Sequence, residues 1–133
     1  MLQAQRDKYL ETAVQTATPA QLLIMLYDGA IRFCKLGIEA IKQKKYDEAN
    51  LNLCKAQDII QEFRITLDPN AEISANLDRL YEYFHRRLIE ANVKKDTQPA
   101  EEVLHFLSEL KETWVEAAKN LKSAKTGTSG HVG

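Results

Sequence analysis

The stretch YDEANLNLCKAQDIIQEFRITL, residues 46–67, decides the fold class of this 133-residue chain. Its apolar residues recur in unbroken steps of three and four, at Tyr46, Ala49, Leu53, Ala56, Ile60, Phe63 and Leu67. Steps of that length return to one side of a helix with about 3.6 residues per turn. The stretch therefore predicts an amphipathic helix that buries one face.

The preceding segment predicts a helix from about Thr18 to Lys42. Thr18 is suited to cap it, Pro19 fits the first helical position, and Gln21 completes a capping box. A seven-residue repeat follows, at Ile24, Ile31 and Ile38 with the companion positions Tyr27, Cys34 and Ile41. Such a repeat is typical of a coiled-coil packing seam.

Two further helices follow the turn Asp68-Pro69-Asn70, which stops the helix before it. The first covers about residues 71–94, with apolar positions at Ile73, Leu77, Leu80, Phe84, Leu88 and Ala91. The second opens at Pro99, with apolar positions at Ala100, Val103, Leu107, Leu110, Trp114, Ala117 and Leu121. Both patterns have the helical period.

Four helices of about 20 residues with short links between them indicate antiparallel neighbours. The sequence therefore predicts an all-α, up-down-up-down four-helix bundle over residues 18–122. Residues 1–17 have weak periodicity and are expected to form an N-terminal arm. Residues 123–133 are small, polar and glycine-bearing, and are expected to form a disordered tail.

Composition excludes several classes of function. The chain has 18 basic and 19 acidic side chains, so it has no basic excess with which to neutralise a nucleic acid. No apolar run approaches the ~20 residues of a membrane span, and the first residues do not resemble a signal peptide. We therefore expect a cytoplasmic protein without membrane insertion. Cys34 and Cys54 are expected to be reduced thiols.

One constellation could carry chemistry. Glu82–His85 and Glu102–His105 are both Glu-x-x-His, the pattern that carboxylate-bridged di-iron bundles use on two helices. On a helical wheel these side chains point sideways or away from the apolar faces, whereas metal ligands in a bundle point inward. Solvated surface charge is the favoured interpretation, and a di-iron bundle is the alternative. No catalytic residue, metal or cofactor is expected, so the protein is not interpreted as an enzyme.

The first helix carries more apolar residues than one packing seam needs. A second stripe consists of Leu22, Leu26, Gly29, Phe33 and Leu36, with Met25 beside it. Its centre lies roughly 150° from the isoleucine repeat on the wheel. The second helix adds a smaller surplus of Leu51, Cys54 and Ile65. These nine residues are the candidate partner-binding surface.

Three occupants of this surplus surface compete. The chain's own arm can cover it, because Tyr9, Leu10 and Val14 are available there. It can also form a homodimer face, in a self-associating structural bundle, or a groove for an amphipathic helix of a partner. A bare apolar strip of this size is unusual on a soluble monomer, so one of the three is expected.

Several segments resemble the FliS family of flagellar secretion chaperones, in the family's order and spacing. They span about residues 9–115 and include TATP (16–19), LIMLYDGAI (23–31), KAQDIIQE (55–62), EISANL (72–77), LYEY (80–83), RLIEAN (87–92) and LKETW (110–114). The turn before Glu72 lacks the glycines found in many members, and Pro69-Asn70 can serve in their place.

The resemblance implies an antiparallel helical bundle that acts as a cytosolic chaperone. Its implied partner is flagellin, whose disordered C-terminal region wraps around the bundle. Holding that region blocks premature polymerisation and keeps flagellin competent for type III export, with the flagellar export gate as a possible second partner. The resemblance also implies that the arm, with Tyr9 near its start, packs on the bundle and shifts when flagellin binds.

Overall fold

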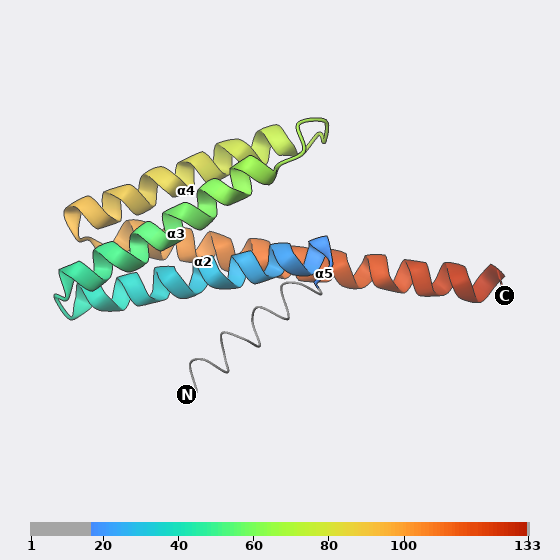
Figure 1. Cartoon of the computed structure of the whole chain (residues 1–133), viewed down its shortest axis with the longest axis horizontal. Helices are drawn as coiled ribbons and strands as arrows, with labels where there is room; N and C mark the ends of the chain where they lie inside the picture. The colour runs from blue at the N-terminus through green and yellow to red at the C-terminus, as the bar shows by residue number, and fades with distance from the viewer. Residues whose placement is uncertain (1–16, 133) are drawn as a thin grey trace.

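The computed structural model describes residues 17–132, with side chains described for residues 17–121. The described residues form four helices and no strand: α2 (Pro19–Lys42), α3 (Tyr46–Thr66), α4 (Ser74–Lys94) and α5 (Thr97–Val132) (Figure 1). The predicted arm residues Tyr9, Leu10 and Val14 lie outside the described range. None of the helices between residues 17 and 132 combines the length and apolarity that crossing a bilayer requires.

The four helices pack in a ring. Helix α2 packs against α3 and α5, and α4 packs against the same two helices. Helices that follow one another in the sequence are joined by short links and lie side by side in opposite directions (Figure 1). This arrangement confirms the predicted antiparallel four-helix bundle.

The start of α2 is the capping box that the sequence predicts. The Gln21 backbone N–H donates to Thr18 Oγ1 at 3.2 Å, and the Thr18 N–H donates to Gln21 Oε1 at 2.9 Å. Pro19 takes the first helical position, where a backbone N–H would have no partner within the helix. The first boundary of the bundle is therefore set by local chemistry.

The links at one end of the bundle are tight. Lys44 and Lys95 have positive φ angles of 60° and 51°, and Lys95 directly caps the C-terminus of α4. A left-handed residue at this position reverses the chain in very few residues. At the other end the link is longer, because residues 67–73 form turns and α4 begins at Ser74 rather than near Ala71. The Ser74 hydroxyl donates to the Asp68 carbonyl and closes that turn.

Helix α5 extends past the other three helices (Figure 1). The sequence predicts that the bundle ends at residue 122 and that a disordered tail begins at 123, whereas the backbone of α5 stays helical to Val132. A helix can continue where no neighbour packs on it, because its hydrogen bonds are internal. A stretch of about ten residues is too short to form a stable helix on its own in water.

The buried core is built around aromatic side chains. The rings of Tyr27 and Phe63 are stacked with centroids 4.5 Å apart, and those of Phe63 and Tyr81 are 5.1 Å apart. Phe84 and Leu88 are also fully buried. The hydroxyl groups of Tyr27 and Tyr81 hydrogen-bond to each other at 2.5 Å, so neither is buried without a partner.

Parts of the predicted seams lie outside this core. Tyr27 and Cys34 are fully buried, but Ile24 and Ile31 are only half-buried. The buried face of α2 is rotated away from those two isoleucines and includes Ala30 and Gly37. The ends of the predicted seams are also exposed, because they lie at or beyond the ends of the neighbouring helices. The exposed seam residues are Tyr46, Ile73, Ala117 and Leu121.

Candidate functional site

Helices α2 and α3 approach each other closely at two glycines of α2. A Cβ atom added to Gly37 would lie 2.7 Å from Cδ2 of Leu53, which is too close for any side chain without movement. A Cβ atom added to Gly29 would lie 3.2 Å from Cδ1 of Ile59. The missing side chain of glycine therefore permits this close approach of the two helices, and Gly29 is a stripe residue that faces α3.

The stripe on α2 lies along the flank that faces α3. Leu26 and Phe33 are half-buried and pack against the core, and Leu22 and Met25 are also half-buried. Leu36 remains 44% exposed. On the helical wheel this stripe lies far from the isoleucine repeat. The buried face of α2 is rotated away from Ile24 and Ile31, toward the stripe, and the stripe is therefore partly covered. A partly covered apolar edge remains along this flank, which we call the α2–α3 flank (Leu22, Met25, Leu26, Gly29, Phe33 and Leu36).

The predicted residues of α3 do not all join that flank. Leu51 is 53% exposed and Ile65 is 77% exposed, so both are open to a partner. Cys54 lies on the other side of α3, where the Asn92 amide of α4 donates to its Sγ atom at 3.8 Å. Its own thiol donates to Asn50 at 3.7 Å. The structure therefore brings Cys54 to α4 and not to α2.

Two cations lie at the ring of Phe33, and sequence analysis did not single them out. The guanidinium carbon of Arg32 is 4.7 Å from the ring centroid, and the ammonium nitrogen of Lys55 is 5.3 Å from it. Both distances are within the range of cation–π attraction. Arg32 is the sequence neighbour of Phe33, but Lys55 comes from α3 and is found only in three dimensions.

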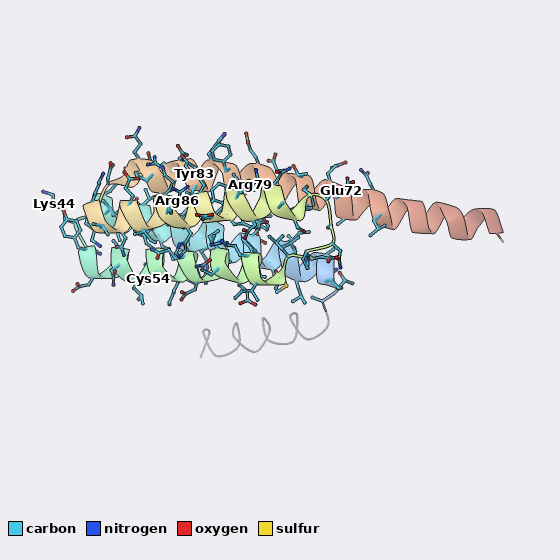
Figure 2. All side chains as sticks on the ribbon, turned by 90° about the horizontal axis from the view of Figure 1, so that it is seen from above. Lys44, Cys54, Glu72, Arg79, Tyr83 and Arg86 are labelled. Atoms are coloured by element: carbon cyan, nitrogen blue, oxygen red, sulfur yellow. The ribbon has the colours of Figure 1, made fainter. Side chains whose placement is uncertain are left out.

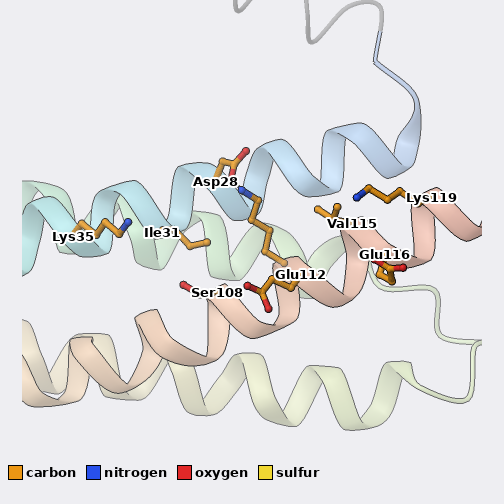
Figure 3. A pocket seen from close by; sticks show the side chains of 9 residues that line it. Asp28, Ile31, Lys35, Ser108, Glu112, Val115, Glu116 and Lys119 are labelled. Atoms are coloured by element: carbon orange, nitrogen blue, oxygen red, sulfur yellow. Dashed lines mark ion pairs between the residues drawn. The ribbon is translucent and has the colours of Figure 1, made fainter.

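A second surface that sequence analysis missed lies between α2 and α5. It is an open groove of about 690 Å³, lined by Ile31 and Val115 and by charged side chains from both helices (Figure 3). Lys111 of α5 forms an ion pair with Asp28 of α2 across it. The sequence places Ile31 on the packing seam, and its position in this groove depends on how α2 packs against α5.

The second Glu-x-x-His motif, Glu102–His105, forms contacts of another kind. The Glu102 carboxylate accepts hydrogen bonds from the Tyr83 hydroxyl and from Nε of Arg87, the latter at 3.2 Å. His105 lies 3.1 Å from Glu109 on its own helix. In residues 17–121 no group of three or more His, Cys, Asp or Glu side chains could hold a metal ion.

His85 and Cys34 are the remaining candidates for reactivity. The pKa of His85 is lowered, first by partial burial and then by the positive charge of Arg64, with Asp58 acting in the opposite direction. Burial raises the pKa of the Cys34 thiol to about 12, so it stays protonated at neutral pH. A protonated, buried thiol is a small apolar packing group and not a nucleophile.

Comparison with known proteins identifies the family. The family model described as "Flagellar protein FliS" matches residues 1–121. A flagellar secretion chaperone FliS of Bacillus subtilis (strain 168) is 38% identical over 122 residues, covering 92% of each chain. The FliS protein of Salmonella typhimurium (strain LT2) is also 38% identical, over 108 residues that cover 79% of this chain and 80% of the relative.

A solved structure agrees with the fold. A crystal structure of a bacterial flagellar chaperone superposes with a TM-score of 0.73 at 20% identity, covering 90% of this chain and 98% of the other. Named FliS relatives are chaperones, and FliS is a chaperone family and not an enzyme family. With a matching family model over nearly the whole chain and relatives at 38% identity, this chain belongs to the FliS family of flagellar proteins.

Proposed function

We propose that this protein is a cytoplasmic chaperone that binds the disordered C-terminal region of flagellin. Holding that region prevents premature polymerisation and keeps flagellin competent for flagellar type III export. The observation that carries the proposal is the α2–α3 flank, together with the exposed Leu51 and Ile65 of α3. The names of the relatives, which are flagellar secretion chaperones, support the same function.

Binding by this surface needs no nucleotide. A disordered segment loses conformational entropy when it is captured, and burial of apolar area offsets that loss. Each well-buried Leu or Phe contributes about 1.5–3 kcal/mol. Leu36 and Leu51, each about half exposed, still have area left to bury. Several such anchors give tight binding in total, while each one alone is weak enough to release in turn during export.

Two further parts belong to this proposal. The arm, through Tyr9, Leu10 and Val14, covers the α2–α3 flank until flagellin displaces it. A contact with the flagellar export gate then brings the loaded chaperone to the export machinery. The resemblance to the family supports both parts, and the apolar residues of the arm support the first.

The test is calorimetric titration of the full chain with a peptide of its host flagellin's C-terminal region. We expect saturable one-to-one binding with a negative heat-capacity change, which is the signature of apolar burial. Sedimentation at several concentrations should run beside it. Absence of binding by a folded monomer contradicts the proposal, and a concentration-dependent dimer without binding favours the self-association alternative.

A further inference from the structure

Phe33 is the point where apolar surface and positive charge meet on this molecule. Its ring is half-buried and packs against the core, and Arg32 and Lys55 lie 4.7 Å and 5.3 Å from its centroid. The two cations come from different helices, α2 and α3, and both are exposed. The α2–α3 flank therefore carries a charged element as well as an apolar edge.

The two cations have no acidic partner in the described part of the chain. Five ion pairs of Lys or Arg and one His–Glu contact form among residues 17–121, and neither Arg32 nor Lys55 takes part in one. The attraction of a ring face holds a cation in place but does not use its N–H donors. A carboxylate placed beside Phe33 would satisfy those donors, and it would add charge-assisted hydrogen bonds.

We propose that Arg32 and Lys55 form a carboxylate-recognition element, which selects a bound segment carrying an Asp or Glu beside its apolar anchor. The anchor packs on the open side of Phe33 while its acidic neighbour pairs with the two cations. This inference rests on the proposed function, because it describes how the same flank recognises its partner.

A charged element can fix the register of a bound segment, which an apolar strip alone does not. Apolar contacts have no direction, so a segment made only of leucines could bind the flank in several registers. One carboxylate held at a fixed point selects a single register and disfavours segments that lack it. The element stays exposed, so each pair contributes little, and it does not prevent release.

The experiment measures the coupling between these cations and acidic residues of the partner. The full chain, an Arg32→Gln/Lys55→Gln variant and an Arg79→Gln/Arg86→Gln variant are titrated with the flagellin C-terminal peptide. The same three proteins are titrated with a peptide whose Asp and Glu residues are replaced by Asn and Gln. The control variant removes two charges from α4, where Arg79 and Arg86 lie on an exposed face (Figure 2).

We expect Arg32→Gln/Lys55→Gln to weaken binding of the acidic peptide about three- to tenfold at low salt, as two exposed ion pairs should. The loss should shrink at high salt and vanish with the neutralised peptide, while the control variant binds like the wild type. Equal losses with both peptides, or no loss, overturn the inference but leave the proposed function standing. If wild-type protein binds neither peptide, the proposed function itself fails.

The arm offers a competing source of the carboxylate, because Asp7 and Glu11 flank Tyr9 and Leu10. An Asp7→Asn/Glu11→Gln variant separates the two sources. We expect the coupling between the cations and the peptide to be unchanged in that variant. If the effect of Arg32→Gln/Lys55→Gln instead disappears there, the arm supplies the carboxylate and the inference is wrong.

Discussion

The hydroxyl oxygens of Tyr27 on α2 and Tyr81 on α4 lie 2.5 Å apart inside the bundle, and each is the other's hydrogen-bond partner. The two helices are not adjacent in the ring, so this bond joins opposite corners of the bundle. Both rings also pack against Phe63 of α3, that of Tyr27 in a stacked and that of Tyr81 in a tilted arrangement. A single buried contact thus ties three helices together.

Removing one hydroxyl should be more costly than removing both. In Tyr81→Phe the Tyr27 hydroxyl stays buried without its partner, and we expect a loss of about 1–3 kcal/mol in the free energy of unfolding. In Tyr27→Phe/Tyr81→Phe both polar groups leave together, so the total should fall short of the sum of the single losses. Urea unfolding of the four proteins measures this cycle. Strict additivity would mean that the two hydroxyls do not depend on each other.

The same pair predicts a loss of stability in alkali. Burial raises the pKa of both Tyr27 and Tyr81 above the ordinary value of 10.0. A pKa that is higher in the folded state gives stability that is complete below the unfolded pKa and is lost as the pH rises past it. We therefore expect the free energy of unfolding to fall above about pH 10. The double Phe variant should lose less over that range, and an identical slope in both proteins would contradict this assignment.

The two glycines of α2 should respond differently to alanine. Gly37→Ala places a methyl group 2.7 Å from Leu53, and the clash should cost about 1–3 kcal/mol. Gly29→Ala meets only the tip of Ile59 at 3.2 Å, and the higher helix propensity of alanine, worth about 1 kcal/mol, should offset that contact. Thermal and urea unfolding measure both. Equal losses would show that the helices do not approach each other as described.

Substitutions at exposed residues of the proposed partner site should weaken binding, whereas substitutions in the core should lower stability. Leu36→Asp and Leu51→Asp change exposed residues, so each should weaken binding of the flagellin peptide about tenfold or more by loss of an apolar anchor. The free energy of unfolding should change by only about 0.5 kcal/mol. Calorimetric titration and urea unfolding of the same samples give both quantities. Unchanged binding in both variants would move the partner site to another face.

Trp114→Ala is the matched control for that experiment. Trp114 packs against the core, so its removal leaves a cavity and should cost about 3 kcal/mol. The folded fraction should still bind the peptide. A variant that stays stable but loses binding would place Trp114 in the partner site and not in the core.

Sequence periodicity predicts most of the fold because it is a local property. The capping box at Thr18, the turn at Pro69 and the unbroken seam of α3 each depend on residues close in the chain. The sequence of α2 alone does not show which face of this helix turns toward the core, because that depends on how closely α3 approaches. Gly37 sets that approach through Leu53 of another helix, so Ile24 and Ile31 are less buried than their repeat indicates.

The candidate site is predicted in part for the same reason. The stripe on α2 is visible in sequence, since all its members lie on one helix. Its relation to α3 is not, and neither is the placement of Lys55 over Phe33. Cys54 is a second example, because its position in the sequence of α3 does not reveal that Asn92 of α4 lies beside it.

The packing of α2 against α5 affects when the bundle can finish folding during synthesis. Asp28 and Lys111 join the first and last described helices, and 82 residues separate them in the sequence. During synthesis α2, α3 and α4 leave the ribosome first, but the ring remains open until α5 follows. A chain interrupted before α5 therefore has an unclosed core. Translation must reach its last helix before a finished bundle can form.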